Sequence, residues 1–140
     1  MKSNGLTRFL NAQNQTYLRA LEEINNGRKT SHWMWFIFPQ LTGLGHSETA
    51  RYYAIQNLRE ATDYLRHPVL GKNLIAIASA LLLHEGRTAM QILGTPDDMK
   101  LRSSMTLFSQ VDDADPVFRE VLLKYFGGHF DPITLGLLHN

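Results

Sequence analysis

The placement of proline constrains this fold more than any other feature of the sequence. Four of the five prolines, Pro68, Pro96, Pro116 and Pro132, lie where a helix can begin. Proline suits the first helical turn because its φ angle is already helical and its missing N–H would have no partner there. No Asn-Gly or Asp-Gly pair lies between alternating apolar residues, as a β-hairpin would require. The sequence therefore predicts an all-α protein.

Capping signals and apolar spacing divide the chain into about six to eight predicted helices. Apolar residues recur every three or four positions from Leu6 to Ile24, as along one helix face, and Gly27 can end that helix. Asn57 followed by Glu60 resembles a capping box. We expect one compact domain over residues 1–140, with helices over 6–24, 47–55, 57–66, 68–85, 88–94 and 116–126, and others beginning near 96 and 132.

Composition and charge exclude several classes of partner. Lys and Arg total 14 against 13 for Asp and Glu, so the net charge of +1 offers no basic surface for nucleic acid. The longest apolar run, residues 74–83, is about half the ~20 residues that cross a bilayer, so no membrane association is expected. The first residues lack the apolar core of a signal peptide, and the chain has no cysteine. We expect a cytoplasmic protein.

Both tryptophans and two of the phenylalanines fall within residues 33–38, which we call the aromatic block. The block has no helical stripe, so it is either a buried turn of helix or a short strand. Such rings most often form ordinary core. They also form the walls of ligand pockets, which are mostly apolar with a few polar groups. His32 and Gln40 flank the block and would supply polar groups to such a pocket.

A second polar segment, residues 100–108, places three hydroxyl side chains inside a predicted helix. Hydroxyls are unfavourable in mid-helix because they compete for backbone hydrogen bonds. Helical spacing puts Lys100, either Ser103 or Ser104, and Leu107 on one side. These donors could face a polar ligand. Alternatively, the small residues allow close helix contact while their hydroxyls bond back to the preceding turn.

Known catalytic and metal-binding motifs do not occur in the chain. None of the six histidines forms a pair with metal-ligand spacing, and there is no nucleophile elbow, phosphate-binding loop or dinucleotide fingerprint. We therefore expect no metal and no cofactor.

Five segments of the chain resemble the bacterial domain-of-unknown-function family 1810, whose members are often labelled "calpastatin". These segments are GRKTSHWMWFIFPQLTGLGHS, residues 52–55, EATDYLRHPVLG, DDMKLRSSMTLF and FGGHFDPITLGLL. The resemblance covers nearly the whole chain and implies a compact, mostly helical fold. It brings no established activity.

The chain is also similar, more distantly, to the NADAR proteins, which act on ADP-ribose derivatives. The order of four short motifs carries this similarity: Glu60-Ala61, residues 104–108, residues 121–123 and Gly127-Gly128. It implies a nucleotide-like or ADP-ribose-like ligand and hydrolysis of an N-glycosidic bond.

The predicted site combines the aromatic block with the second polar segment. Hydrolysis of a glycosidic bond needs a carboxylate or histidine near the anomeric carbon, and the sequence does not choose among His32, Asp112 and Asp131. The residues expected to bind the small molecule are His32, Trp33, Trp35, Gln40, Lys100, Ser103, Ser104 and Thr106.

The alternative function is a non-enzymatic module that binds a protein partner through an exposed part of the aromatic block. A concave cleft beside the two tryptophans, His32 and Lys100 would favour the small ligand. A convex apolar patch would favour the protein partner.

Overall fold

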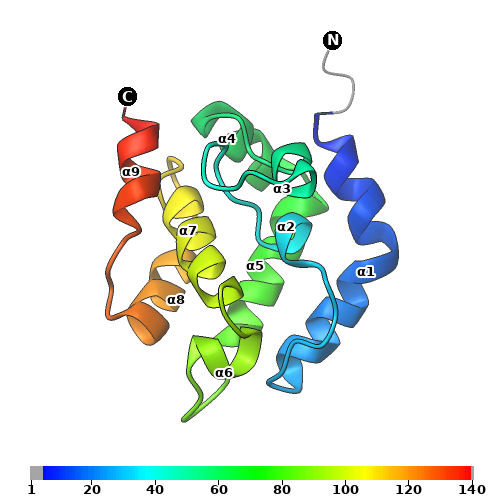
Figure 1. Ribbon diagram of the computed structural model, residues 1–140, viewed down its shortest axis with the longest axis vertical. Coiled ribbons are helices and arrows are strands. Elements are labelled where there is room, and N and C mark those ends of the chain that lie inside the picture. The colour runs from blue at the N-terminus through cyan, green and yellow to red at the C-terminus, as the bar shows by residue number, and fades with distance from the viewer. Residues whose placement is uncertain (1–4, 140) are drawn as a thin grey trace.

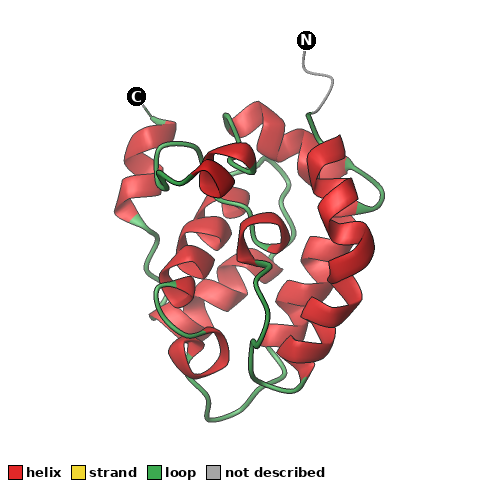
Figure 2. Ribbon diagram, turned by 45° about the vertical axis from the view of Figure 1, so that its right-hand side comes forward, coloured by secondary structure: helices red, strands yellow, loops and turns green. Residues whose placement is uncertain are grey.

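A computed structural model describes residues 5–139 of the chain, and within that range it contains helices and loops but no strand (Figures 1 and 2). The prediction of an all-α protein is confirmed. Nine helices occur in this range instead of six to eight, because the aromatic block itself forms a helical turn. They are α1 (Thr7–Asn25), α2 (Met34–Ile37), α3 (Glu48–Tyr52), α4 (Leu58–Arg66), α5 (Leu70–Leu81), α6 (Ala89–Leu93), α7 (Asp97–Ser109), α8 (Val117–Phe126) and α9 (Pro132–Leu138).

Helix α7 lies at the centre of one half of the molecule and packs against α4, α6, α8 and α9. Helix α5 joins this half to the other, since it packs against α1, α4 and α8. Helices α1 and α9 lie at opposite sides (Figure 1). All residues of α7 from Ser103 to Ser109 are buried, although four of these seven are serine or threonine. Small side chains let the neighbouring helices approach α7 closely on several sides.

The predicted helix starts at residues 47, 57 and 88 are capped by the expected side chains. The Ser47 side chain accepts a hydrogen bond from the Ala50 amide, and the Asn57 side chain accepts one from the Glu60 amide at 2.9 Å. Thr88 forms a full capping box with Gln91. Each interaction joins residues three apart, which is why the sequence alone could indicate it.

Two predicted helices are shorter than expected. The helix from Ser47 ends at Tyr52 instead of near Ile55, because Ile55 forms a parallel bridge with Leu41. The helix expected from Pro68 begins at Leu70. The imidazole of His67 accepts hydrogen bonds from the amides of Val69 and Leu70 at this start. That helix ends at Leu81 and not near residue 85.

The bridge between Leu41 and Ile55 closes a loop that carries α3. The Ile55 amide donates to the Gln40 carbonyl, and the Thr42 amide donates to the Ile55 carbonyl, both at 2.8 Å. This closure fixes Gln40 and the segment 41–47 beside α7. No helix among residues 5–139 has both the length and the apolar composition needed to cross a membrane.

Candidate functional site

The aromatic block divides its two tryptophans between different environments. Trp33 is fully buried in the core, whereas Trp35 is half-buried. The turn of helix α2 separates them, so their side chains leave the backbone in different directions. Phe38 is also fully buried, and Phe36 is half-buried. The block is therefore mainly core, and Trp35 is the part of it that lines a cleft.

A buried carboxylate, Glu23, holds the segment that leads into the block. One of its oxygens accepts hydrogen bonds from the Thr30 amide at 2.8 Å, the Ser31 amide at 3.0 Å and the indole N–H of Trp33 at 2.8 Å. The other accepts from the Ser31 hydroxyl at 2.6 Å. Burial by itself raises the pKa of Glu23, but the bonds from Ser31, Thr30 and Trp33 outweigh it and lower the pKa to about 2. Glu23 is thus a charged structural anchor for the block.

A cleft of about 470 Å³ lies between segment 40–47, α7 and the start of α9. We call it the Lys100 cleft. Its size falls within the range of small-molecule sites. Its wall contains apolar side chains, such as those of Met99 and Ile133, and polar ones, such as those of Gln40 and Asp131. The residues that line it are Trp35, Gln40, Leu44, Gly45, His46, Ser47, Ala50, Pro96, Met99, Lys100, Ser103, Asp131 and Ile133.

The cation of this cleft is held on an aromatic surface. The Lys100 ammonium lies 4.6 Å from the ring centroid of Trp35 and 3.3 Å from a carboxylate oxygen of Asp97. The other Asp97 oxygen lies 2.9 Å from the ammonium of Lys29, which in turn lies 5.1 Å from the Trp33 ring centroid. One carboxylate therefore bridges two lysines, and this cluster carries a net positive charge beside the cleft.

The anion of the cleft, Asp131, is nearly buried and belongs to a hydroxyl network. Its Oδ2 accepts hydrogen bonds from the Ser103 hydroxyl at 2.9 Å, the Thr134 hydroxyl at 2.6 Å and the Thr134 amide at 3.3 Å. Its Oδ1 accepts from the Ile133 amide at a long 3.4 Å. The Asp131 amide donates to the hydroxyl of Thr106 at 2.9 Å. These bonds tie the start of α9 to the middle of α7.

The structure brings together four of the eight residues expected to bind a ligand. Trp35, Gln40, Lys100 and Ser103 all line the Lys100 cleft, together with Asp131 from the three catalytic candidates. The other two catalytic candidates, His32 and Asp112, are exposed and do not line it.

The remaining predicted ligand residues, Trp33, Ser104 and Thr106, are fully buried. The Ser104 hydroxyl has no hydrogen-bond partner among the described residues. Thr106 supports Asp131 from inside the core. The Ser103 hydroxyl lies 3.2 Å from the Met99 carbonyl oxygen, one turn earlier, as well as 2.9 Å from Asp131 Oδ2, so it bonds back along α7 although it also lines the cleft.

Sequence reasoning missed three residues that shape this region: Glu23, Asp97 and Thr134. The spacing of Asp97 and Lys100, three apart on one helix, was a signal for their ion pair. Thr134 lies three residues after the N-cap Asp131, where an N3 side chain can reach the cap. The neighbouring residues of Glu23 do not predict its hydrogen bonds, because its partners lie beyond the end of its own helix.

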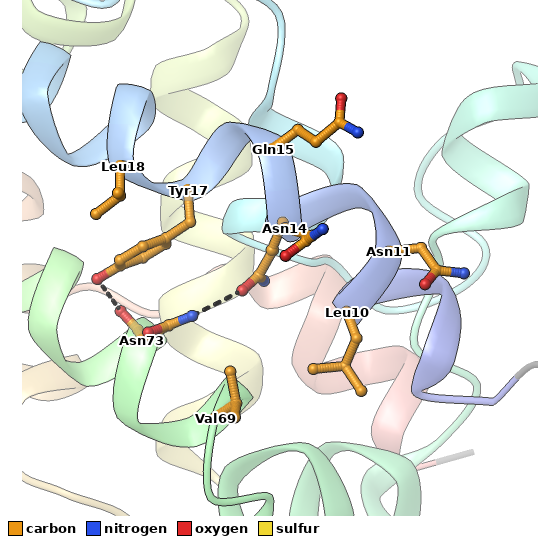
Figure 3. A pocket seen from close by; sticks show the side chains of 9 residues that line it. Leu10, Asn11, Asn14, Gln15, Tyr17, Leu18, Val69 and Asn73 are labelled. Atoms are coloured by element: carbon orange, nitrogen blue, oxygen red, sulfur yellow. Dashed lines mark hydrogen bonds between the residues drawn. The ribbon is translucent and has the colours of Figure 1, made fainter.

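A second groove lies between α1 and α5 and has a different chemistry (Figure 3). The Tyr17 hydroxyl donates to the Asn73 carbonyl at 3.0 Å, and the Asn73 side chain donates to Gln13 at 3.2 Å (Figure 3). Burial raises the pKa of Tyr17. The groove has no charged lining residue, so it offers nothing that would hold an ionic ligand. The described residues contain no group of three or more His, Asp or Glu side chains that could hold a metal ion.

Comparisons with known proteins agree with this architecture. Residues 3–138 match the family model described as "Protein of unknown function (DUF1810)". The crystal structure of the conserved hypothetical protein Rv1873 from Mycobacterium tuberculosis is similar, with a TM-score of 0.96 and 45% sequence identity over 99% of each chain. No curated protein matches the chain.

Proposed function

The chain belongs to the DUF1810 family of proteins of unknown function, and we propose that it binds a small nucleotide-like or ADP-ribose-like ligand in the Lys100 cleft. The observation that carries this proposal is the meeting of Lys100, Trp35 and Asp131 in one cavity of small-molecule size. These residues come from three separate elements, α2, α7 and the cap of α9.

The cluster of Lys29, Asp97 and Lys100 beside the cleft supports a ligand with an anionic group. Asp97 is shared between two lysines, so Lys29 continues to neutralise it when Lys100 turns toward a ligand. An ammonium group can then donate charge-assisted hydrogen bonds to phosphate oxygens. Gln40 and Ser47 supply uncharged donors and acceptors at the cleft wall. Such a mixture of apolar wall and convergent polar groups is typical of nucleotide-sized sites.

We extend the proposal to hydrolysis of an N-glycosidic bond, with Asp131 as the proton acceptor. Water would add to the anomeric carbon as the carbon–nitrogen bond breaks. Asp131 would take the proton from the water and return it to the leaving nitrogen, so that atoms and charge balance. The support for this step is that Asp131 is the buried carboxylate lining the cleft, with one oxygen only weakly engaged.

The alternative of a protein-interaction module receives less support from the geometry. Its docking surface would be an exposed part of the aromatic block, but Trp33 and Phe38 are fully buried and Trp35 faces a cleft. Within the block only Trp35 and Phe36 are partly exposed, which gives a protein partner few apolar side chains to contact.

Thermal-shift measurements with ADP-ribose, ADP, AMP and inorganic phosphate test the ligand proposal. We expect at least one nucleotide to raise Tm, since ligand at 100 times its Kd stabilises a protein by about 2.7 kcal/mol. Lys100→Met should remove this rise, because the ligand loses its charged partner.

Lys124→Met is the matched control, since Lys124 also lies over an aromatic ring, 5.8 Å from the Tyr125 centroid, but outside the cleft. This variant should keep the wild-type ligand response. A panel that leaves Tm unchanged, or a response that survives Lys100→Met, would contradict the proposal.

A further inference from the structure

We infer that the Lys100 cleft recognises the phosphate ester of a sugar that carries a free hydroxyl group, as in ribose 5-phosphate, and does not stack an aromatic base on Trp35. This inference rests on the proposed function and deepens it, because it states which end of a nucleotide-like ligand the cleft takes. It depends on three observations about Trp35, Asp131 and Lys29.

The first observation is that a cation already covers Trp35. A base stacks on an exposed ring face, and Trp35 is the sole tryptophan, tyrosine or phenylalanine among the residues lining this cleft. The Lys100 ammonium lies 4.6 Å from its ring centroid, and both groups line the same cavity. A base would have to displace this cation from the ring and from Asp97. The indole therefore serves as a platform for the lysine.

The second observation is the unequal use of the two Asp131 oxygens. Three donors hold Oδ2, at 2.6 to 3.3 Å, whereas Oδ1 accepts only the 3.4 Å bond from Ile133. A carboxylate oxygen has room for two donors, so Oδ1 can still accept a strong hydrogen bond. Because Asp131 lines the cleft, a ligand hydroxyl is the group that fits there.

The third observation is the placement of Lys29. Its side chain is 9% exposed and its ammonium lies 2.9 Å from Asp97, while Lys100 is 24% exposed and lies 3.3 Å from the same carboxylate. The more buried lysine thus forms the shorter contact. Lys100, which lines the cleft, is less closely paired with Asp97, so its ammonium group can bind an anion. Lys100 and Ser103 lie one turn apart on α7, so the cation and the Asp131 network share one side of the cleft.

Calorimetric titration with ribose 5-phosphate, inorganic phosphate, ribose and adenosine tests this assignment. We expect ribose 5-phosphate to bind at least about tenfold more tightly than inorganic phosphate, because the hydroxyl adds a charge-assisted hydrogen bond. Ribose and adenosine should give no detectable binding, because neither carries the anion. Lys100→Met should abolish binding of both phosphates.

The variant Asp131→Asn distinguishes the part of the site that binds the ligand hydroxyl, at Asp131, from the part that binds the phosphate, at Lys100. Ser103 and Thr134 donate to the Oδ2 position, so they should hold the amide oxygen there and turn the NH₂ group toward the cleft. A donor then replaces the acceptor for the ligand hydroxyl. We expect affinity for ribose 5-phosphate to fall about tenfold while affinity for inorganic phosphate is unchanged. Asn also remains a good N-cap for α9. Asp115→Asn, at an exposed position just before α8 and outside the cleft, is the control and should change neither affinity.

The possible results distinguish this inference from the proposed function. If ADP-ribose or AMP binds but ribose 5-phosphate does not, or if adenosine binds as well as ribose 5-phosphate, the inference is wrong and the proposed function stands. If inorganic phosphate binds as tightly as ribose 5-phosphate, or Asp131→Asn weakens both equally, the role of Asp131 is wrong. If none of these compounds binds, the proposed function fails and the inference fails with it.

Discussion

Glu23 shows how one residue can control a segment that lies outside its own helix. Its carboxylate accepts four hydrogen bonds from residues 30–33, including that from the indole of Trp33. In the segment between α1 and α2, the amides of residues 26–29 donate to backbone carbonyls, whereas those of Thr30 and Ser31 donate to Glu23. A charged acceptor forms stronger hydrogen bonds than a neutral one, so the negative charge of Glu23 strengthens its four hydrogen bonds.

The low pKa of Glu23 predicts a pH dependence of stability. Its folded pKa of about 2 lies below the ordinary 4.5, so the carboxylate stabilises the fold above pH 4.5. That contribution, about 3 kcal/mol, is lost as the pH falls toward 2. Glu23→Gln should lower the free energy of unfolding by a similar amount at pH 7 and by much less near pH 2.5. Urea denaturation at both pH values measures the difference.

Glu22→Gln is the control for this experiment, because Glu22 is an exposed neighbour on the same helix. It should leave stability nearly unchanged at both pH values. A Glu23→Gln variant as stable as the wild type at pH 7 would show that the hydrogen bonds to Glu23 contribute little net free energy.

At the scale of elements, glycine controls how closely α4 and α5 approach. Gly71 lies in the first turn of α5, and a Cβ atom built there would lie 2.0 Å from the carbonyl oxygen of Leu65 in α4. That oxygen belongs to the backbone and cannot turn aside. Gly136 in α9 also lies inside a helix, but a Cβ there would meet no atom within 4 Å. Alanine substitutions at the two positions therefore distinguish the effect of a steric clash from the effect of helix propensity.

Alanine at these two glycines should change stability in opposite directions. Gly71→Ala should destabilise the protein by about 3 kcal/mol, because one of the two helices must shift to relieve the contact. Gly136→Ala should stabilise it by about 0.5–1 kcal/mol, because alanine loses less backbone entropy in a helix. Melting temperatures of both variants measure this. A Gly71→Ala variant that melts with or above the wild type would show that α4 and α5 can separate at little cost.

At the scale of the whole molecule, the packing of α7 predicts cooperative unfolding. Helix α7 contacts four other helices, and its Ser103 and Thr106 hold the start of α9 through Asp131. Detachment of α4, α6, α8 or α9 would expose the buried face of α7. Both tryptophans lie in the aromatic block, while helical signal comes from the entire described chain.

We therefore expect circular dichroism and tryptophan fluorescence to follow the same unfolding transition in urea. A small single domain unfolds as one unit when no part of its core is independent. Two separate midpoints would contradict this and would show that the region around the aromatic block unfolds on its own. Repeating the measurement on Gly136→Ala provides a control, since both probes should shift together.

Helix positions could be predicted from the sequence to the extent that their signals are local. The caps at Ser47, Asn57 and Asp131 each bond to amides two or three residues away, so neighbouring residues contain all the information. Where a distant partner intervened, the prediction failed. Helix α3 ended early because Ile55 pairs with Leu41, and no spacing rule indicates that bridge.

The sequence alone therefore determined the helical class, most helix starts and two of the segments that line the cleft. The tertiary structure decided which side chains in those segments meet. Ser103 and Ser104 are neighbours about 100° apart on one helix, and the contact with α9 places the first on the cleft and the second in the core. In the same way, the Glu23 carboxylate holds Trp33 inside while Trp35 lines the cleft. Periodicity specifies the angles between side chains along a helix, but the helices packed around it decide which side chain lines the cleft and which is buried in the core.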